Sequence, residues 1–139
     1  MKEFTVEAKV ENLDMVIAFV NSELETADCP MKIQMQIELA VEEIFVNIAH
    51  YAYGEETGSA TVTVDVSSGD TAVICFSDSG VQYDPLAKED PDVTLSVEKR
   101  SIGGLGIFMT KKSMDHISYE YRDGHNVLTM EKRIGVSAG

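Results

Sequence analysis

The spacing of hydrophobic and polar residues changes several times along the chain, and each change predicts a new element. Phe4 to Val10 alternate apolar and polar, which is typical of a half-buried strand. Apolar residues then recur at helical spacing from Leu13 to Glu25, which predicts a first helix. A second, longer helix is predicted from Pro30 to about Tyr53, because proline is well tolerated in the first turn of a helix. The first part of the chain is therefore a strand followed by two helices.

Two hairpin patterns follow the second helix. Ala60 to Val66 and Ala72 to Ser77 are predicted strands, joined across the turn sequence SSGD. Near the end of the chain, Ile117 to Tyr121 and Val127 to Ile134 form a second predicted pair, joined across RDGHN. These strands supply most of the predicted sheet.

A long loop and a short helix separate the hairpins. Asp78 to Ser101 show no sustained periodicity, and long loops in compact domains are often lids or binding segments. Ile107 to Met114 predict a third helix. The element order predicts an α+β fold, a two-layer sandwich in which three helices lie on one face of a mostly antiparallel sheet. With 139 residues, the chain is expected to form one domain over residues 1–139.

Composition and charge narrow the possible partners. The chain is 44% hydrophobic and 25% charged, as in an ordinary globular protein. Its formal net charge of −13 argues against nucleic acid and favours solubility and a basic protein partner, and the alternative is an acidic surface that is merely solvated. It has no apolar run near the roughly 20 residues of a membrane span and no signal-peptide pattern at its start, so we expect no membrane contact and a cytoplasmic location. Cys29 and Cys75 lack partner histidines at zinc-ligand spacing.

The first candidate for chemistry lies on the second helix. Glu43 and Asn47 are one turn apart at the border of its apolar face. A carboxylate and a carboxamide at this spacing present two oxygens in one direction, which suits a hard cation or a polarised hydroxyl. The alternative is an ordinary helix-surface pair with a weak hydrogen bond.

A second candidate lies where a predicted strand ends. Asp78 can accept a hydrogen bond from an exocyclic amine, and Gly80 lets a flat ring approach the backbone. The alternative is that Asp-Ser-Gly simply forms a turn.

The third candidate is the glycine-rich stretch from Gly103 to Gly106, directly before the third helix. Glycines there leave backbone N–H groups open at the positive end of the helix dipole, where phosphate is stabilised. Lys88, Lys99 and Arg100 supply cations for the same anion. The sequence GGLG matches neither a Walker P-loop nor a dinucleotide fingerprint, and a flexible hinge is the alternative.

Together, and in this order and spacing, the three candidates resemble the N, G1 and G2 boxes of the GHKL ATPases. Within that superfamily the chain is most similar to the short, stand-alone bacterial anti-sigma regulatory serine kinases. The similarity is carried by ELAVEEIFVNIAHYAY, DSGVQYDPL and GGLGIFMTKKSMDHISY and extends from about Phe4 to Ile134. The resemblance implies the Bergerat α/β sandwich, which agrees with the element order.

The resemblance also implies roles for individual residues. Asn47 would ligate a Mg²⁺ that bridges ATP phosphates, and Glu43 would act as general base on the attacking hydroxyl. Asp78 would bind the adenine amine, with Gly80 giving the ring room. Residues 84–101 would form the lid. The other implied nucleotide contacts are Lys99, Arg100, Gly103, Gly104, Leu105, Gly106 and Asn126. Asn126 stands where many members have threonine beside adenine, and it can hydrogen-bond directly or through water.

The function implied by the resemblance is that of a Mg-ATP-dependent serine kinase. It would phosphorylate an antagonist (anti-anti-sigma) protein and sequester a sigma factor, and the resemblance also implies a homodimer. A nucleotide-binding module that switches partner binding without phosphotransfer is the main alternative. A histidine kinase core or a larger GHKL machine is disfavoured, because such proteins need a phosphoacceptor helix pair or a transducer domain.

Overall fold

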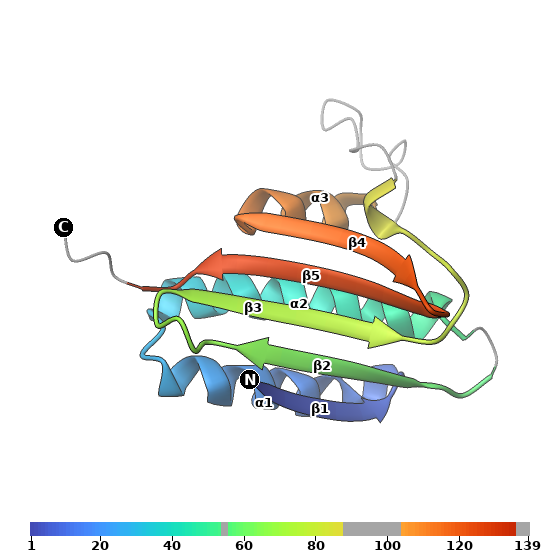
Figure 1. Cartoon of the computed structure of the whole chain (residues 1–139), viewed down its shortest axis with the longest axis horizontal. Helices are drawn as coiled ribbons and strands as arrows, with labels where there is room; N and C mark the ends of the chain where they lie inside the picture. Colours follow the sequence, from blue (N-terminus) through green and yellow to red (C-terminus); the bar gives the residue numbers. More distant parts are fainter. Residues whose placement is uncertain (54–55, 88–103, 136–139) are drawn as a thin grey trace.

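The elements of the computed structural model follow the predicted order (Figure 1). The structure describes residues 1–53, 56–87 and 104–135. In chain order the elements are β1 (Lys2–Glu7), the 3₁₀ turn η1 (Val10–Asn12), α1 (Leu13–Thr26), α2 (Met31–Tyr51), β2 (Ser59–Asp65), β3 (Thr71–Asp78), the 3₁₀ turn η2 (Pro85–Ala87), α3 (Gly104–Ser113), β4 (His116–Arg122) and β5 (His125–Arg133).

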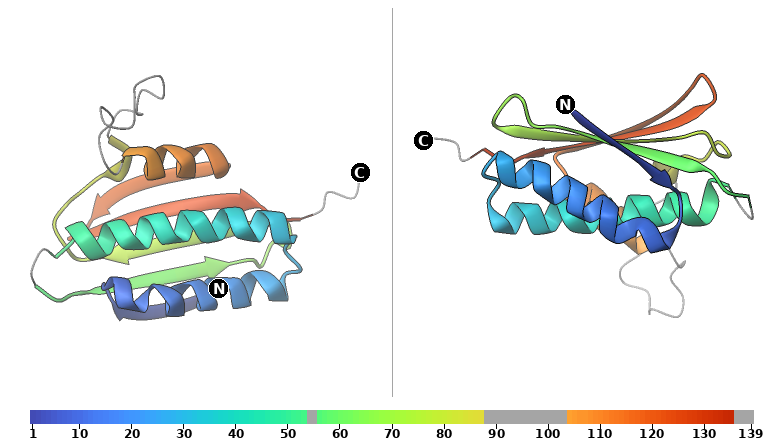
Figure 2. Two further views of the ribbon diagram at one scale, coloured as in Figure 1. Left: turned by 180° about the vertical axis from the view of Figure 1, so that it is seen from behind. Right: turned by 90° about the horizontal axis from the view of Figure 1, so that it is seen from below.

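The strands form one antiparallel sheet in the order β1-β2-β3-β5-β4. The two hairpins, β2/β3 and β4/β5, therefore meet at the β3/β5 pair, although these strands are far apart in the sequence. All three helices cover the same face of the sheet (Figure 2). The predicted α+β two-layer sandwich is confirmed.

The hydrophobic core fills the space between the sheet and the helices. Along β2 and β3, buried residues alternate with half-buried ones, as expected for strands covered on one face. Val64 and Phe76 of the sheet belong to one buried cluster with Val20 of α1 and with Ile37 and Phe45 of α2, and each of these residues is at most 1% exposed. Burial of this apolar surface is the main force that holds the helices against the sheet.

The first strand ends earlier than the predicted Phe4 to Val10. It stops at Glu7, because the chain then turns into η1 and α1. Two hydrogen bonds support that turn: the Ala8 N–H donates to the Gly58 carbonyl at 2.8 Å, and Asn12 Nδ2 donates to the Glu7 carbonyl at 2.9 Å. These hydrogen bonds, one of them to the distant Gly58, override the alternation at this point.

The last hairpin is tighter than predicted. Asp123 and Gly124 have φ values of 53° and 79°, so they form the two-residue turn with both residues in the left-handed region. As a result β5 begins at His125, and Asn126 lies inside the sheet instead of in a loop. This shift places Asn126 directly opposite Asp78 of β3.

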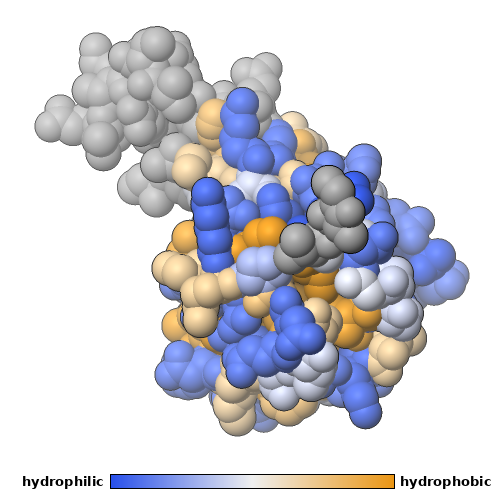
Figure 3. Space-filling model, turned by 90° about the vertical axis from the view of Figure 1, so that its left-hand side faces the viewer, coloured by the Kyte–Doolittle hydropathy of each residue, from blue (hydrophilic) through white to orange (hydrophobic). Residues whose placement is uncertain are grey.

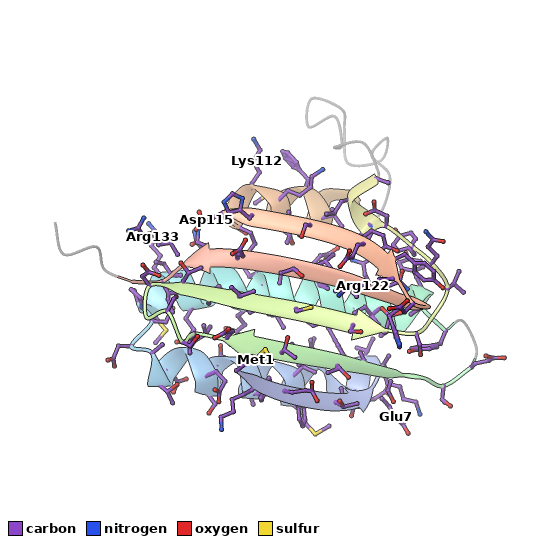
Figure 4. The ribbon with its side chains drawn as sticks, in the orientation of Figure 1. Met1, Glu7, Lys112, Asp115, Arg122 and Arg133 are labelled. Carbon is purple, nitrogen blue, oxygen red and sulfur yellow. The ribbon has the colours of Figure 1, made fainter. Side chains whose placement is uncertain are left out.

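Polar contacts fix the end of α3 to the sheet. Lys132 Nζ donates to the Ser113 carbonyl at 2.6 Å, which satisfies an unpaired carbonyl at the helix C-terminus. Asp115 accepts from the Arg133 N–H at 2.6 Å, and Figure 4 shows these two residues side by side at one end of the sheet. The position of α3 relative to the sheet is therefore set at its C-terminal end.

The surface is mostly polar at one end of the molecule. The end of the molecule opposite the β4/β5 turn is largely hydrophilic, with smaller hydrophobic areas between the polar residues (Figure 3). Among the helices of residues 1–53, 56–87 and 104–135, none has the length and apolar character needed to cross a bilayer.

Candidate functional site

The second predicted candidate, Asp78, lies at the end of β3, in register with Asn126 of β5. Each of these two polar side chains is only 7% exposed. Asp78 Oδ1 accepts two hydrogen bonds of 2.9 Å, one from the Gly80 N–H and one from Asn126 Nδ2. No described residue bonds to Asp78 Oδ2. The carboxylate is thus held through one oxygen, and the other is left as a free acceptor.

A cleft lies beside this carboxylate, between the C-terminal half of α2 and the end of the sheet near the β4/β5 turn. About 410 Å³ of empty space lies among its lining residues, a figure that includes the open solvent at its mouth. Most of its lining is apolar or aromatic, and a few polar side chains converge on it. The lining residues are Ile44, Asn47, Ile48, Tyr51, Ala52, Phe76, Asp78, Val81, Tyr83, Pro85, Tyr119, Asn126 and Leu128. Apolar walls with a few placed polar groups are typical of small-molecule sites.

Gly80 brings the turn after β3 against the C-terminal end of α2. The Val81 N–H donates to the Ala52 carbonyl at 2.7 Å. A Cβ added at Gly80 would lie 2.2 Å from the Ala52 carbonyl oxygen and 2.6 Å from its carbonyl carbon. Glycine is required here by a backbone-to-backbone approach, whereas the sequence had indicated room for a ring.

Replacing Gly80 by alanine is therefore expected to destabilise the protein. The neighbouring atoms are backbone and cannot rotate away, so the turn or α2 must shift, at a cost of about 1–3 kcal/mol. Urea denaturation measures the loss. Val81→Ala is the control, because the Val81 side chain is 67% exposed and should change stability little. Equal stability of the two variants would show that the close approach is not maintained in solution.

The first predicted candidate, the pair on α2, forms the hydrogen bond that the sequence offered as the alternative, and its roles toward a cation or a hydroxyl stay predictions. Asn47 Nδ2 donates to the Glu43 carbonyl at 2.8 Å and to Glu43 Oε1 at 3.0 Å. Both donor hydrogens of the carboxamide are thereby used, and no described residue bonds to Asn47 Oδ1. This oxygen is therefore the atom of Asn47 that could coordinate a hard cation.

Glu43 also contacts the first turn of α3. A Cβ added at Gly106 would lie 2.2 Å from Glu43 Cδ and Oε2. Glu43 and Gly106 line a hollow between α2 and α3, whereas Asn47 lines the cleft beside Asp78. Since Asn47 and Glu43 are bonded to each other, the two hollows adjoin.

The third predicted candidate differs in part from the expectation. The third helix was predicted to begin at Ile107, with a glycine loop before it, but α3 begins at Gly104. Gly104, Leu105 and Gly106 therefore lie in its first turn. This part of the prediction was wrong because two glycines were treated as helix breakers, although glycine in a helix costs only about 1 kcal/mol. First-turn N–H groups have no partner within a helix, so they can still face an anion.

Other predicted contacts lie outside the described residues. These are Lys99, Arg100 and Gly103, together with residues 88–101 of the predicted lid. The first lid residues are described: the Leu86 N–H donates to Asp84 Oδ1 at 2.8 Å, and η2 follows. The lid and these three contacts remain predictions.

Sequence reasoning did not identify the aromatic residues of the cleft as site residues. The rings of Tyr51 and Tyr83 lie 5.6 Å apart between centroids. Tyr119 of β4 donates a hydrogen bond of 2.5 Å to Asn126 Oδ1. Burial raises the pKa of Tyr119, and the carboxylates of Asp84 and Asp78 add to this effect. The three tyrosines lie within the segments that carry the resemblance, but three separate segments supply them, so spacing along the chain does not show that they share a cleft.

A metal held only by protein side chains is not indicated in the described parts of the chain. They contain no group of three or more His, Cys, Asp or Glu side chains able to hold an ion. A cation at Asn47 Oδ1 would need ligands from a bound molecule, and phosphate oxygens suit Mg²⁺.

Comparisons with known proteins identify relatives of this chain. The serine-protein kinase RsbW of Listeria monocytogenes is 31% identical over 97 residues, which is 66% of this chain and 61% of that protein. The matched region thus spans less than two thirds of this relative. The serine/threonine-protein kinase BtrW of Bordetella bronchiseptica is 25% identical over 99 residues, covering 71% of this chain and 70% of that protein.

Solved structures share the fold. The RsbU and RsbW domains of a Mycobacterium tuberculosis protein superpose with a TM-score of 0.65 at 12% identity, covering 99% of this chain and 34% of that one. The catalytic domain of the histidine kinase ThkA superposes with a TM-score of 0.53 at 14% identity, covering 99% of this chain and all of that one. The family profile described as histidine kinase-like ATPase domain matches residues 6–132. Because this match spans most of the chain, the protein belongs to the histidine kinase-like ATPase domain family.

Proposed function

We propose that the protein binds Mg-ATP and transfers the terminal phosphoryl group to a serine of an antagonist protein, as an anti-sigma regulatory kinase. One observation carries the proposal: Asp78 and Asn47 line the same cleft, and Asn47 is bonded to Glu43, which contacts the first turn of α3. A base-recognising carboxylate, a cation ligand and a proton acceptor thus follow one another in the order that phosphoryl transfer needs.

The cleft would hold the adenine ring. Its apolar and aromatic walls suit a flat heterocycle, and Asp78 Oδ2 would accept a hydrogen bond from the exocyclic amine. Asn126 stays a predicted neighbour of the base, although its amide atoms are already bonded within the protein.

Asn47 would hold the metal through Oδ1. Its Nδ2 is anchored to Glu43, so the oxygen is directed without further rearrangement. Bound Mg²⁺ would supply charge neutralisation on the phosphates. The first turn of α3 would offer N–H groups to the same phosphates, and Lys99 and Arg100 would add positive charge.

Glu43 would act as the general base. It would accept the proton of the serine hydroxyl as the serine oxygen bonds to the γ-phosphorus and the bond from phosphorus to the bridging oxygen of ADP breaks. Its contact with α3 supports this role, because the first turn of α3 would bind the phosphates. Positioning and electrostatic stabilisation would supply most of the rate enhancement.

The regulatory part of the proposal concerns partners. The relatives are named serine-protein kinases, and the net charge of −13 suits a basic partner surface such as a segment of a sigma factor. The phosphorylation state of the antagonist would then determine whether this protein binds the sigma factor. A homodimer would fit the same family.

Incubation with γ-labelled ATP, Mg²⁺ and a candidate anti-anti-sigma protein tests the proposal. We expect label on one serine of that protein, located by mass spectrometry, and micromolar binding of Mg-ATP by calorimetry. Tight binding without any labelled serine would contradict the kinase and favour a nucleotide-controlled switch. Absence of both binding and label would contradict the nucleotide site itself.

Asp78→Asn is expected to weaken ATP binding roughly ten- to hundredfold, the value of one charge-assisted hydrogen bond. Asparagine can keep the contacts of Oδ1 with Gly80 and Asn126, but it replaces the free acceptor by a donor. Calorimetry measures the affinity, and Asp70→Asn, in the exposed β2/β3 turn, is the matched control. Unchanged affinity in Asp78→Asn would exclude the carboxylate from base recognition.

A further inference from the structure

We propose that Asn126 and Tyr119 are positioning residues that fix the Asp78 carboxylate in one orientation, so that only Oδ2 forms a hydrogen bond with the base. In this arrangement Asn126 does not contact the base, and the pair acts on nucleotide selectivity through Asp78. The inference rests on the proposed function, because it takes adenine as the ligand of the cleft.

The Asn126 carboxamide is fully bonded within the protein. Its Nδ2 donates to Asp78 Oδ1 at 2.9 Å and to the Val81 carbonyl at 2.8 Å. Its Oδ1 accepts from the Tyr83 N–H at 3.0 Å and from the Tyr119 hydroxyl at 2.5 Å. A carboxamide has two donor hydrogens and two acceptor positions, so no capacity is left for a ligand.

These partners also fix the orientation of the carboxamide. A flipped amide would turn its NH₂ group toward the Tyr83 N–H, which cannot accept, and toward the Tyr119 hydroxyl, which would then have to accept instead of donate. It would also turn its oxygen toward Asp78 Oδ1 and the Val81 carbonyl, which are acceptors. Only one orientation satisfies all four groups, and an unsatisfied buried polar atom is costly.

Tyr119 supplies the contact that is most open to testing. Its hydroxyl is the one side-chain donor among the partners of Asn126 that the structure describes. Burial raises the pKa of Tyr119, so the hydroxyl stays protonated and remains a donor at neutral pH. Removing it takes away one of the two bonds that hold Asn126 Oδ1.

The network acts on the ligand through Asp78. Asn126 Nδ2 and the Gly80 N–H together occupy Oδ1, so rotation of the carboxylate would break two hydrogen bonds. Oδ2 therefore remains an acceptor in a fixed place. The amine of adenine can donate to it, whereas the carbonyl oxygen at the same ring position of hypoxanthine would face it as a second acceptor. The fixed carboxylate thus favours binding of ATP over binding of inosine triphosphate.

The test uses Tyr119→Phe, with Tyr121→Phe as the matched control on the same strand. The Tyr121 side chain is 42% exposed. Calorimetry gives the affinities for ATP and inosine triphosphate in each protein. We expect the wild type to prefer ATP at least about tenfold, Tyr119→Phe to reduce that preference about threefold or more, and Tyr121→Phe to leave it unchanged.

A second measurement needs no nucleotide. In the free protein, both side-chain NH₂ protons of Asn126 should exchange with solvent much more slowly than those of an exposed asparagine, because both are bonded to buried acceptors. Tyr119→Phe should speed their exchange. Since this variant keeps the ring, it is expected to fold. Asn126→Asp, which replaces the donor by an acceptor, should remove the preference for ATP.

The outcomes separate the two proposals. Preference for ATP that is unchanged in Tyr119→Phe and in Asn126→Asp overturns the positioning role, even if the protein is a kinase. Fast exchange of the Asn126 NH₂ protons in the wild type also overturns it. If the wild type binds neither nucleotide, the proposed function fails and the selectivity claim fails with it, while slow exchange would still support the fixed carboxylate.

Discussion

Phosphotransfer by the Glu43→Gln variant is expected to be about 10²–10⁴-fold slower than that of the wild type, while its affinity for Mg-ATP stays within about threefold. The magnitude is that of a general base removed from phosphoryl or acyl transfer. Glutamine has nearly the same shape, and its Oε1 can still accept the hydrogen bond from Asn47 Nδ2 that Glu43 Oε1 accepts at 3.0 Å. The variant therefore removes the carboxylate that would accept the proton, and it preserves the hydrogen bond with Asn47. Label transfer under single-turnover conditions measures the rate.

Glu42→Gln is the matched control for this experiment. It makes the same chemical change one residue earlier, on an exposed side chain of α2. We expect its transfer rate to equal that of the wild type. If Glu43→Gln transfers phosphate normally, another group is the base. If Glu43→Gln loses ATP binding as well, Glu43 contributes to the nucleotide site instead of to the proton transfer.

The second large effect is expected for Gly106→Ala, which should lower phosphotransfer roughly ten- to hundredfold with little change in stability. The new Cβ would lie 2.2 Å from Glu43 Cδ and Oε2 and 2.4 Å from Oε1. These atoms are the end of a flexible side chain, so the carboxylate can move away. A displacement of about 1 Å in a reacting group can cost about 10²-fold in rate.

Stability should move in the opposite direction from activity in this variant. Gly106 lies within α3, and alanine is favoured over glycine in a helix by about 1 kcal/mol. Thermal denaturation should therefore show an unchanged or slightly higher Tm. A marked fall in Tm would mean that the backbone of α3, and not the Glu43 side chain, absorbs the added methyl group.

A double-mutant cycle links the two variants. If Gly106→Ala acts by displacing the Glu43 carboxylate, it should have little further effect on transfer in the Glu43→Gln background. Independent, multiplying effects would contradict this coupling. They would indicate that Gly106 acts on the phosphates directly, as the glycine-rich sequence alone suggests.

Sequence reasoning was most reliable where the physical cause was local. The period of two in β2 and β3 and the period of 3.6 in α1 and α2 follow from one buried face in each element. The pairing of Glu43 with Asn47 was predictable for the same reason, because residues four apart on a helix are neighbours. Asp78 was found at the end of its strand, where the turn after it was already visible in the sequence.

Other features depended on contacts between distant segments. The antiparallel pairing of β3 with β5 cannot be read from either hairpin alone, and it is this pairing that places Asn126 opposite Asp78. The tight turn at Asp123 and Gly124 moved Asn126 into the strand. The need for glycine at position 80 comes from the carbonyl of Ala52, which arrives from another element.

The sequence by itself determined the alternation and helical periods, the two-layer class and the separate polar candidates, because each depends on neighbours along the chain. The tertiary structure decided which atoms of those candidates remain available. In the structure, Asn126 forms hydrogen bonds through all its amide positions, and Glu43 contacts α3. Asp78 Oδ2 and Asn47 Oδ1 have no partners among the described residues. The physical reason is that each polar group can form only a limited number of hydrogen bonds, and its partners come from the segments that the sheet brings together. Spacing along the chain does not show which segments those are.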